Sequence, residues 1–348
     1  MTGSAHAAAA SVTETELAAM RRALSLAATP GVPRGPNPRV GAILLDAAGA
    51  TIAEGFHRGA GTAHAEADAL THAGGRAAGA TAIVTLEPCN HSGRTGPCSQ
   101  ALIASGVRRV VFGQSDPNPV AAGGADRLRA AGVEVVGGAL ADEARALNRA
   151  WTFAVTHGRP LVTWKVASTL DGRIAAADGS SRWITGAAAR AEVHELRAEV
   201  DAVVVGTGTV LADDPELTAR HQDGSLRDHQ PLRVVLGARP VPEGARLRDG
   251  TAPLVVLPEQ APAQALKELA EHHSVQHVLL EAGPTLGTAF LRAGLVDEVR
   301  WYVAPKLLGA GRSVVGDLQV GTIADAFGLS VQAVARVGTD VRIDLAQG

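Results

Sequence analysis

Short apolar runs alternate with amphipathic segments along both halves of the sequence. Near the start, Thr13 and Glu16 have the spacing of a capping box, which predicts the first turn of a helix. That helix carries Leu17, Met20 and Leu24 on one face. The strand and helix patterns that follow are typical of βαβ units and a largely parallel sheet. In the first half we predict strands at 40–45, 82–86, 109–112 and 133–136, and helices at 99–104, 126–131 and 139–155.

The second half repeats this alternation after a break at residues 157–160, His-Gly-Arg-Pro. Because 348 residues are many for one domain, we place a boundary near residue 150 and expect domains at 1–150 and 151–348. The residues from 329 onward are more strand-like than helical. In this half we predict strands at 161–166, 202–205, 232–236, 254–257, 275–280 and 299–303, and helices at 187–198, 263–271 and 285–293.

Composition and charge disfavour several classes of function. Apolar residues make up 46% and charged residues 19% of the chain, which supports a globular core. Aromatic residues make up only 3% and the net charge is −3, so a protein that stacks bases or follows a polyanion is disfavoured. No apolar run approaches the roughly 18 residues of a membrane span, and the N-terminal residues do not resemble an export signal. We therefore expect a cytoplasmic protein without nucleic-acid or membrane partners.

The two cysteines, Cys89 and Cys98, leave three interpretations open: a disulfide, two core thiols, or two ligands of one metal ion. Structural disulfides are rare in the cytoplasm, which favours the metal. His64, at the predicted start of a helix, supplies a third ligand and leaves one zinc position open for water. Glu66, two residues later, is placed to move a proton without binding the metal. His-x-Glu followed by Pro-Cys is the pattern of zinc deaminases, although each part alone is common by chance.

The segment between the cysteines, residues 90–97, is much longer than the Cys-x-x-Cys spacing of nucleoside and nucleic-acid deaminases. Its sequence, Asn-His-Ser-Gly-Arg-Thr-Gly-Pro, contains a histidine, an arginine and two glycines. These residue types suit a phosphate group through charge-assisted bonds and backbone N–H groups. A solvated turn is the alternative interpretation.

Two glycine-containing turns mark a second possible site. Gly206 and Gly208 follow a predicted strand, and Gly283 follows another, so the backbone could approach a cofactor phosphate closely. Neither turn has the G-x-G-x-x-G pattern of the Rossmann fold. Taken alone, each turn is better explained by ordinary loop packing.

Several motifs match one known family. In the first half these are TLEPCNHSGRTGPC at 85–98, PNPRVG at 36–41, HAE at 64–66 and DPNP at 116–119. In the second half they are the segments 165–173, 181–185, 209–215 and 304–309. Over about residues 20–348 the chain thus resembles the bifunctional deaminase/reductases of riboflavin biosynthesis. It departs from them at Asn90 and Gly96, usually Ser and Pro, and at Gly237-Ala238, usually Asp and a small hydroxyl residue.

The resemblance implies a three-layer α/β/α domain like that of cytidine deaminase, followed by an α/β domain like dihydrofolate reductase. The first domain would remove an amino group hydrolytically from 2,5-diamino-6-ribosylamino-4(3H)-pyrimidinone 5′-phosphate. One Zn²⁺ per chain would be held by His64, Cys89 and Cys98, with Glu66 as the catalytic acid and base. A plain turn also explains the Asp-Pro-Asn-Pro motif. The implied substrate contacts are Asn37, His91, Arg94, Thr95, Asp116 and Asn118.

The second domain would then use NADPH to reduce the ribosyl group of the product to ribityl, with Lys165 or Asp213 as the proton donor. Arg239 could meet the 2′-phosphate of the cofactor. The implied cofactor contacts are Ala167, Trp183, Thr209, Asp213, Gly283, Pro284, Thr285, Leu286, Gly287, Thr288 and Ala289. The implied substrate contacts are Ser181, Arg197, Leu217, Arg220 and Glu281.

Some of these residues also have ordinary explanations. Arg197 and Arg220 suit a phosphate because a guanidinium forms forked bonds, yet Arg197 could also belong to a solvated helix face. Trp183 could be a core residue.

Two alternatives to the whole assignment remain at this stage. One is a different zinc deaminase, acting on nucleosides or tRNA and fused to an unrelated domain. The other is a zinc-stabilised scaffold without turnover, although such sites normally have four protein ligands. The favoured partner is a small phosphorylated pyrimidine, and we expect a homo-oligomer.

Overall fold

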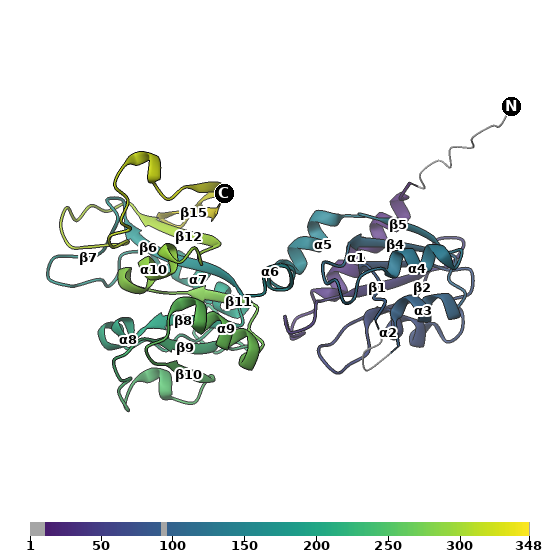
Figure 1. Cartoon of the computed structure of the whole chain (residues 1–348), viewed down its shortest axis with the longest axis horizontal. Coiled ribbons are helices and arrows are strands. Elements are labelled where there is room, and N and C mark those ends of the chain that lie inside the picture. Colours follow the sequence, from purple (N-terminus) through teal and green to yellow (C-terminus); the bar gives the residue numbers. More distant parts are fainter. Residues whose placement is uncertain (1–10, 92–95, 348) are drawn as a thin grey trace. The chain divides into compact units, whose positions relative to one another are not determined.

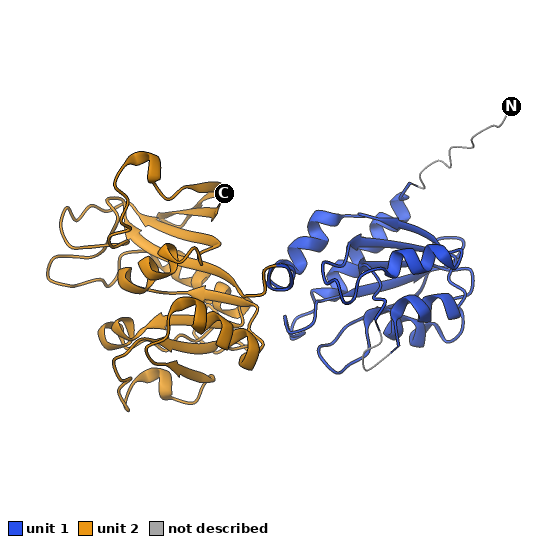
Figure 2. Cartoon of the chain, viewed as in Figure 1, with its two compact units in different colours: residues 1–156 blue, residues 157–348 orange. Residues whose placement is uncertain are grey.

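The structure, a computed structural model, describes residues 11–91 and 96–347. It divides into two compact units, residues 1–156 and 157–348 (Figure 2). The division falls a few residues after the boundary expected near residue 150, because Trp151 of α6 (Arg149–His157) is buried in the core of unit 1. Among the described residues, no helix is both long and apolar enough to cross a membrane.

Unit 1 begins with the predicted capping box. The Thr13 side chain accepts a hydrogen bond from the Glu16 backbone N–H at 3.2 Å, and the Glu16 carboxylate accepts one from the Thr13 N–H at 2.8 Å. The elements of the unit are α1 (Glu14–Ala27), β1 (Gly41–Leu45), β2 (Thr51–Phe56), α2 (Ala65–Ala73), β3 (Thr81–Leu86), α3 (Cys98–Ala104), β4 (Arg109–Gln114), α4 (Gly124–Ala130), β5 (Glu134–Gly137), α5 (Ala141–Leu147) and α6 (Figure 1).

The strands of unit 1 form a sheet in the order β2-β1-β3-β4-β5, between two layers of helices. One face packs against α1, through Met20 and Ala23, and the other against α2, α3 and α4. Because both faces are covered, β1, β3 and β4 are buried along their whole length, which explains why their sequences are mostly apolar rather than alternating.

Two features of unit 1 differ from the sequence prediction. The strand β2 was missed, and β1 pairs antiparallel with both β2 and β3, so only β3, β4 and β5 are parallel. The single helix expected at 139–155 is two helices that meet at Asn148. The Asn148 side chain bonds both the N–H and the C=O of Arg39, each at 2.8 Å, and this interaction holds the junction against the sheet.

Unit 2 is built around an eight-stranded sheet in the order β10-β9-β8-β11-β6-β12-β15-β14. Its elements are β6 (Leu161–Thr169), β7 (Arg173–Ala175), α7 (Ala187–Glu199), β8 (Ala202–Gly206), α8 (Thr207–Asp213), β9 (Leu232–Leu236), η1 (Arg246–Arg248), β10 (Leu254–Leu257), α9 (Pro262–His273), β11 (His277–Leu280), α10 (Pro284–Arg292), β12 (Glu298–Ala304), β13 (Arg312–Ser313), η2 (Ile323–Asp325), β14 (Leu329–Val337) and β15 (Asp340–Gln347) (Figure 1).

The six strands from β10 to β12 run parallel, whereas β15 and β14 form an antiparallel hairpin at the edge. The helices α9 and α10 cover one face and α7 and α8 the other. The strand-like character predicted for the last residues is confirmed by β14 and β15. Residues 207–213, expected as a glycine-containing turn, instead form the short helix α8 directly after β8.

Candidate active sites

In unit 1, three side chains with metal-binding atoms lie together at the ends of three elements. His64 is the N-cap of α2, Cys89 follows β3, and Cys98 is the first residue of α3. Their ligand atoms lie within 4.8 Å of one another. His64 Nδ1 is 3.6 Å from Cys89 Sγ and 3.3 Å from Cys98 Sγ. One imidazole nitrogen and two sulfurs at this spacing are a donor set that fits zinc.

The thiols of this cluster are not equivalent. The hydrogen bond from Cys98 lowers the pKa of Cys89 to about 4, and the neighbouring His64 acts in the same direction. The hydrogen bond between Cys98 and Cys89, together with burial, raises the pKa of the Cys98 thiol. These contacts favour the thiolate form of Cys89, which is the form that binds a metal cation.

Glu66 lies in the first turn of α2 beside the cluster and is 5% exposed. Burial raises the pKa of its carboxyl group to about 7, and the negative charge of Cys89 adds to this effect. A carboxyl group that titrates near neutral pH can both accept and return a proton, as general acid–base catalysis requires.

The structure places the other residues implied for unit 1 as follows. The Asn37 amide lies 3.1 Å from the ring of His57, whose own ring packs edge-on against His64 with 5.5 Å between centroids. The Nδ1 atom of His91 is buried without a hydrogen-bond partner among the described residues. Arg94 and Thr95 lie outside the residues that the structure describes.

The Asp116-Pro-Asn-Pro segment forms a turn. Asp116 accepts a hydrogen bond from the Asn118 N–H at 2.9 Å, and Asn118 accepts one from the Val120 N–H at 3.1 Å. Burial raises the pKa of Asp116 to about 6, and the nearby charge of Glu87 adds to it. This turn is stabilised by its own side chains, as the alternative interpretation of the motif expected.

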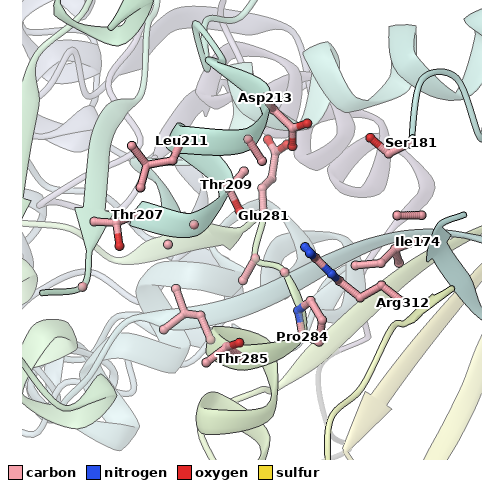
Figure 3. Close-up of a pocket in the computed structure, with 18 of the residues that line it drawn as sticks. Ile174, Ser181, Thr207, Thr209, Leu211, Asp213, Glu281, Pro284, Thr285 and Arg312 are labelled. Carbon is pink, nitrogen blue, oxygen red and sulfur yellow. The ribbon is translucent and has the colours of Figure 1, made fainter. Parts of the chain in front are cut away.

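In unit 2, a cavity of about 1320 Å³ lies beside β6 and the N-terminal ends of α8 and α10 (Figure 3). Its volume is large enough for a dinucleotide and a small substrate together. The implied residues that line it are Lys165, Ala167, Ser181, Thr209, Asp213, Glu281, Gly283, Pro284, Thr285, Leu286 and Ala289. Those that do not line it are Trp183, Arg197, Leu217, Arg220, Gly287 and Thr288.

Arg197 lies behind the cavity wall and bonds a residue that lines it. Its guanidinium donates two hydrogen bonds to the Glu281 carboxylate, at 2.6 and 2.8 Å, and a third to the Thr218 carbonyl at 3.2 Å. The pair is largely buried, and burial lowers the pKa of the neighbouring Lys165. The two N–H groups of the Arg197 guanidinium therefore hold the Glu281 carboxylate in place.

The remaining implied residues outside the cavity lining have structural contacts. Arg220 donates to Glu216, to Thr218 and to the Gly224 carbonyl, and Leu217 is buried in the core. Trp183 is 62% exposed.

Two residues of α10 also have packing roles. A side chain at Gly287 would come within 2.7 Å of the Trp164 ring, so the glycine allows the helix to approach β6. The Thr288 hydroxyl accepts a hydrogen bond from the Gly316 N–H at 2.8 Å.

Two arginines, Arg239, which was named from the sequence, and Arg312, which was not, line the cavity. Arg312, on β13, points into the cavity in Figure 3 and was missed, because two residues of strand give no sequence signal. Arg239 lines the cavity, and one of its guanidinium nitrogens lies 3.0 Å from the position of a Cβ built on Gly208. Gly237 has φ +142°, and a built Cβ there would lie 2.8 Å from the Thr207 hydroxyl. The departure from the family at Gly237 therefore gives Thr207 its space.

Comparison with known proteins agrees with this geometry. Residues 13–114 match the cytidine and deoxycytidylate deaminase zinc-binding region, and residues 160–342 match the RibD C-terminal domain. The riboflavin biosynthesis protein RibD of Mycobacterium tuberculosis (strain ATCC 25618 / H37Rv) is 48% identical over 311 residues, which cover 89% of this chain and 91% of that protein. The chain belongs to the RibD family. RibD of Escherichia coli (strain K12) is 40% identical over 94% of this chain and 98% of its own length.

Solved RibD structures share the fold. Acinetobacter baumannii RibD, form 1, superposes with a TM-score of 0.85 at 39% identity and covers 96% of this chain and 99% of its own. The diaminohydroxyphosphoribosylaminopyrimidine deaminase/5-amino-6-(5-phosphoribosylamino)uracil reductase of Thermotoga maritima gives 0.83 at 35% identity, with the same coverage. The predicted cytidine-deaminase-like domain, followed by a dihydrofolate-reductase-like domain, is confirmed. The chain is a bifunctional deaminase and reductase of riboflavin biosynthesis.

Proposed function

We propose that unit 1 deaminates 2,5-diamino-6-ribosylamino-4(3H)-pyrimidinone 5′-phosphate, and that unit 2 reduces the ribosyl group of the product to ribityl with NADPH. The observation that carries this proposal is the presence of two separate sites: the His64, Cys89 and Cys98 cluster with buried Glu66 in unit 1, and the large cavity in unit 2. The name of the Thermotoga maritima relative specifies the same two reactions.

In the first reaction, His64, Cys89 and Cys98 would hold one zinc ion per chain. When bound, zinc supplies a water molecule whose pKa is lowered toward neutrality. Glu66 would accept a proton from the attacking water and pass it to the ring nitrogen. It would then take the second proton from the newly added hydroxyl group and give it to the departing amine, so that the C=O bond forms as the C–N bond breaks and ammonia leaves. The pKa of about 7 suits the carboxyl group to both directions of transfer.

Two contacts in this site remain proposals from the geometry. Asn37 would hold the ribosyl side of the substrate. His91, whose buried Nδ1 atom has no partner in the part of the chain that the structure describes, would meet the substrate ring or phosphate. Arg94 and Thr95 keep their implied roles as phosphate contacts.

In the second reaction, NADPH would supply the hydride that adds to C1′ of the opened sugar. Lys165 lies in the cavity wall and has a pKa lowered by burial, so it gives up a proton more readily than an exposed lysine. We propose Lys165 as the proton donor to the former ring oxygen, with Asp213 as the other acid of the site. Glu281, held by Arg197, would orient the sugar.

Arg239 on the cavity wall is a suitable partner for the 2′-phosphate of NADPH. Arg239 has no ion pair or hydrogen bond to a described residue in the structure, and its chain neighbours Ala238 and Pro240 carry no charge that would repel a phosphate. A guanidinium fork binds a dianionic phosphate through charge-assisted bonds. We propose that this contact favours NADPH over NADH.

We also propose that the protein acts in the cytoplasm as a homo-oligomer. The outer strand β14 exposes Val331 and Val334, 62% and 63% accessible, and Ile323 of η2, which precedes it in the chain, is 92% accessible. An edge strand with exposed apolar side chains suits pairing with a second copy. Light scattering of the purified protein should give a multiple of the chain mass.

The function is tested by incubating the protein with the diaminopyrimidinone ribosyl phosphate, with and without NADPH, and measuring product masses. Replacement of an amino group by oxygen adds about one mass unit, and the reduction about two more. Removal of zinc with a chelator should abolish the first change but leave reduction of already deaminated substrate. Absence of both changes in the zinc-loaded protein would contradict the proposal.

A further inference from the structure

The His57 side chain has no role in the reaction described above, yet it is held in the deaminase unit by hydrogen bonds to Ala63 and Asn37 and by a longer one, 3.4 Å, to the Thr62 hydroxyl. His57 follows β2 directly and is 5% exposed. Its Nδ1 atom lies 2.9 Å from the carbonyl oxygen of Ala63, and its Nε2 atom lies 3.1 Å from the side-chain nitrogen of Asn37. The imidazole therefore joins the residue before the metal ligand His64 to a residue of the loop that precedes β1.

The chemistry of these two bonds determines which atoms carry hydrogen. A carbonyl oxygen can only accept, so Nδ1 of His57 must carry the proton. In the neutral ring Nε2 then has a lone pair, and it accepts from the amide N–H of Asn37. The amide of Asn37 is thereby fixed with its Oδ1 atom on the opposite side. This oxygen has no hydrogen-bond partner among the described residues.

The backbone on both sides of this contact is also held. The His57 N–H donates to the Val40 carbonyl at 2.9 Å, and the backbone of Arg39 is clamped by Asn148. The ring of His57 packs edge-on against that of His64. Asn37 is therefore held at a fixed place relative to the metal ligands.

We propose that His57 is a positioning residue that orients the Asn37 amide, so that Oδ1 accepts a hydrogen bond from a sugar hydroxyl of the pyrimidine substrate. This inference rests on the proposed deaminase function and deepens it. An amide fixed before binding loses no freedom when the substrate arrives, so His57 contributes to substrate binding. It does not take part in the proton transfers of Glu66.

The test compares three variants: His57→Phe, Asn37→Ala and the double variant. His57→Phe keeps an aromatic ring at this position but removes every hydrogen bond of the side chain. Each variant should raise KM for deamination roughly 5- to 30-fold, the factor for one hydrogen bond of about 1–2 kcal/mol, with kcat changed little. The double variant should be no worse than Asn37→Ala, because His57 acts only through Asn37. His57→Gln, whose side-chain oxygen can still accept from Asn37, should recover part of the loss.

His72→Phe is the matched control, because His72 Nδ1 also bonds a backbone carbonyl, that of Glu54, but on the surface. It should leave KM unchanged. Zinc content and the reductase activity of unit 2 show that each variant is folded. A normal KM in His57→Phe, losses that add in the double variant, or a fall in kcat alone would overturn the inference. If the wild-type protein does not deaminate the substrate, the proposed function itself fails.

Discussion

Replacement of Arg197 by alanine tests whether this residue supports the reductase site through Glu281. In the wild type the two side chains are 14% and 11% exposed and share two hydrogen bonds of 2.6 and 2.8 Å. Arg197→Ala leaves the Glu281 carboxylate without its main partner, and it also removes the bond to the Thr218 carbonyl. The change thus leaves the negative charge of Glu281 largely buried and without its arginine partner.

Loss of one member of a buried ion pair costs about 3–5 kcal/mol in the free energy of unfolding. Lys165 remains close enough to lower the pKa of Glu281, so we expect the low end, about 3 kcal/mol. Combining Arg197→Met with Glu281→Gln removes both charges and should recover most of this loss. The control is Lys267→Ala, whose pair with Glu271 spans 3.9 Å and is largely exposed, and it should cost less than about 1 kcal/mol.

The assay is urea unfolding followed by tryptophan fluorescence. Trp164, Trp183 and Trp301 lie in unit 2, whereas Trp151 lies in unit 1, so the signal reports mainly on the reductase unit. A loss in Arg197→Ala no larger than that in Lys267→Ala would refute the reasoning. A further refuting result would be a double variant, Arg197→Met with Glu281→Gln, that lost as much free energy of unfolding as the sum of the losses in its two single variants.

Three further predictions concern the two sites and the start of the fold. Glu66→Gln should keep zinc but lower kcat for deamination roughly 10²- to 10⁴-fold, with reduction of the deaminated substrate unchanged in a coupled NADPH assay. Arg239→Ala should weaken NADPH binding roughly 10- to 100-fold by fluorescence titration; an equal loss for NADH would contradict a 2′-phosphate contact. Burial raises the pKa of Glu16, but the hydrogen bonds from Arg109 and Thr13 and the charge of Arg109 together outweigh it, and the net pKa is lowered. The stability from this pair is therefore present above the ordinary pKa of glutamate and lost as pH falls through the lowered value. The difference in Tm between wild type and Glu16→Gln should be largest near neutral pH and shrink towards about pH 3; a constant difference would contradict the linkage.

Most elements of the fold are readable from the sequence because their signals are local. Strands covered on both faces, such as β3 and β4, are mostly apolar rather than alternating, and the capping box at Thr13 is a pattern of four residues. The strand β2 was not predicted because it lies on the sheet edge, with an exposed first residue and mixed polarity. Its place depends on pairing with β1, which no local pattern encodes.

By itself, the sequence predicted the chemistry of the first site. The order His64, Glu66, Cys89, Cys98 and the length of the intervening loop indicate a zinc deaminase because ligand identity and spacing are properties of the chain.

Only the tertiary structure decided which side chains meet across distant segments. It joined Arg197 to Glu281, 84 positions apart, and His57 to Asn37, 20 positions apart, and it placed Arg312 on the cavity wall. From the sequence, Arg197 was expected to bind a phosphate. Its actual partner could not be read from the sequence, because it depends on which groups folding brings within hydrogen-bond distance. Burial then makes that partner energetically important.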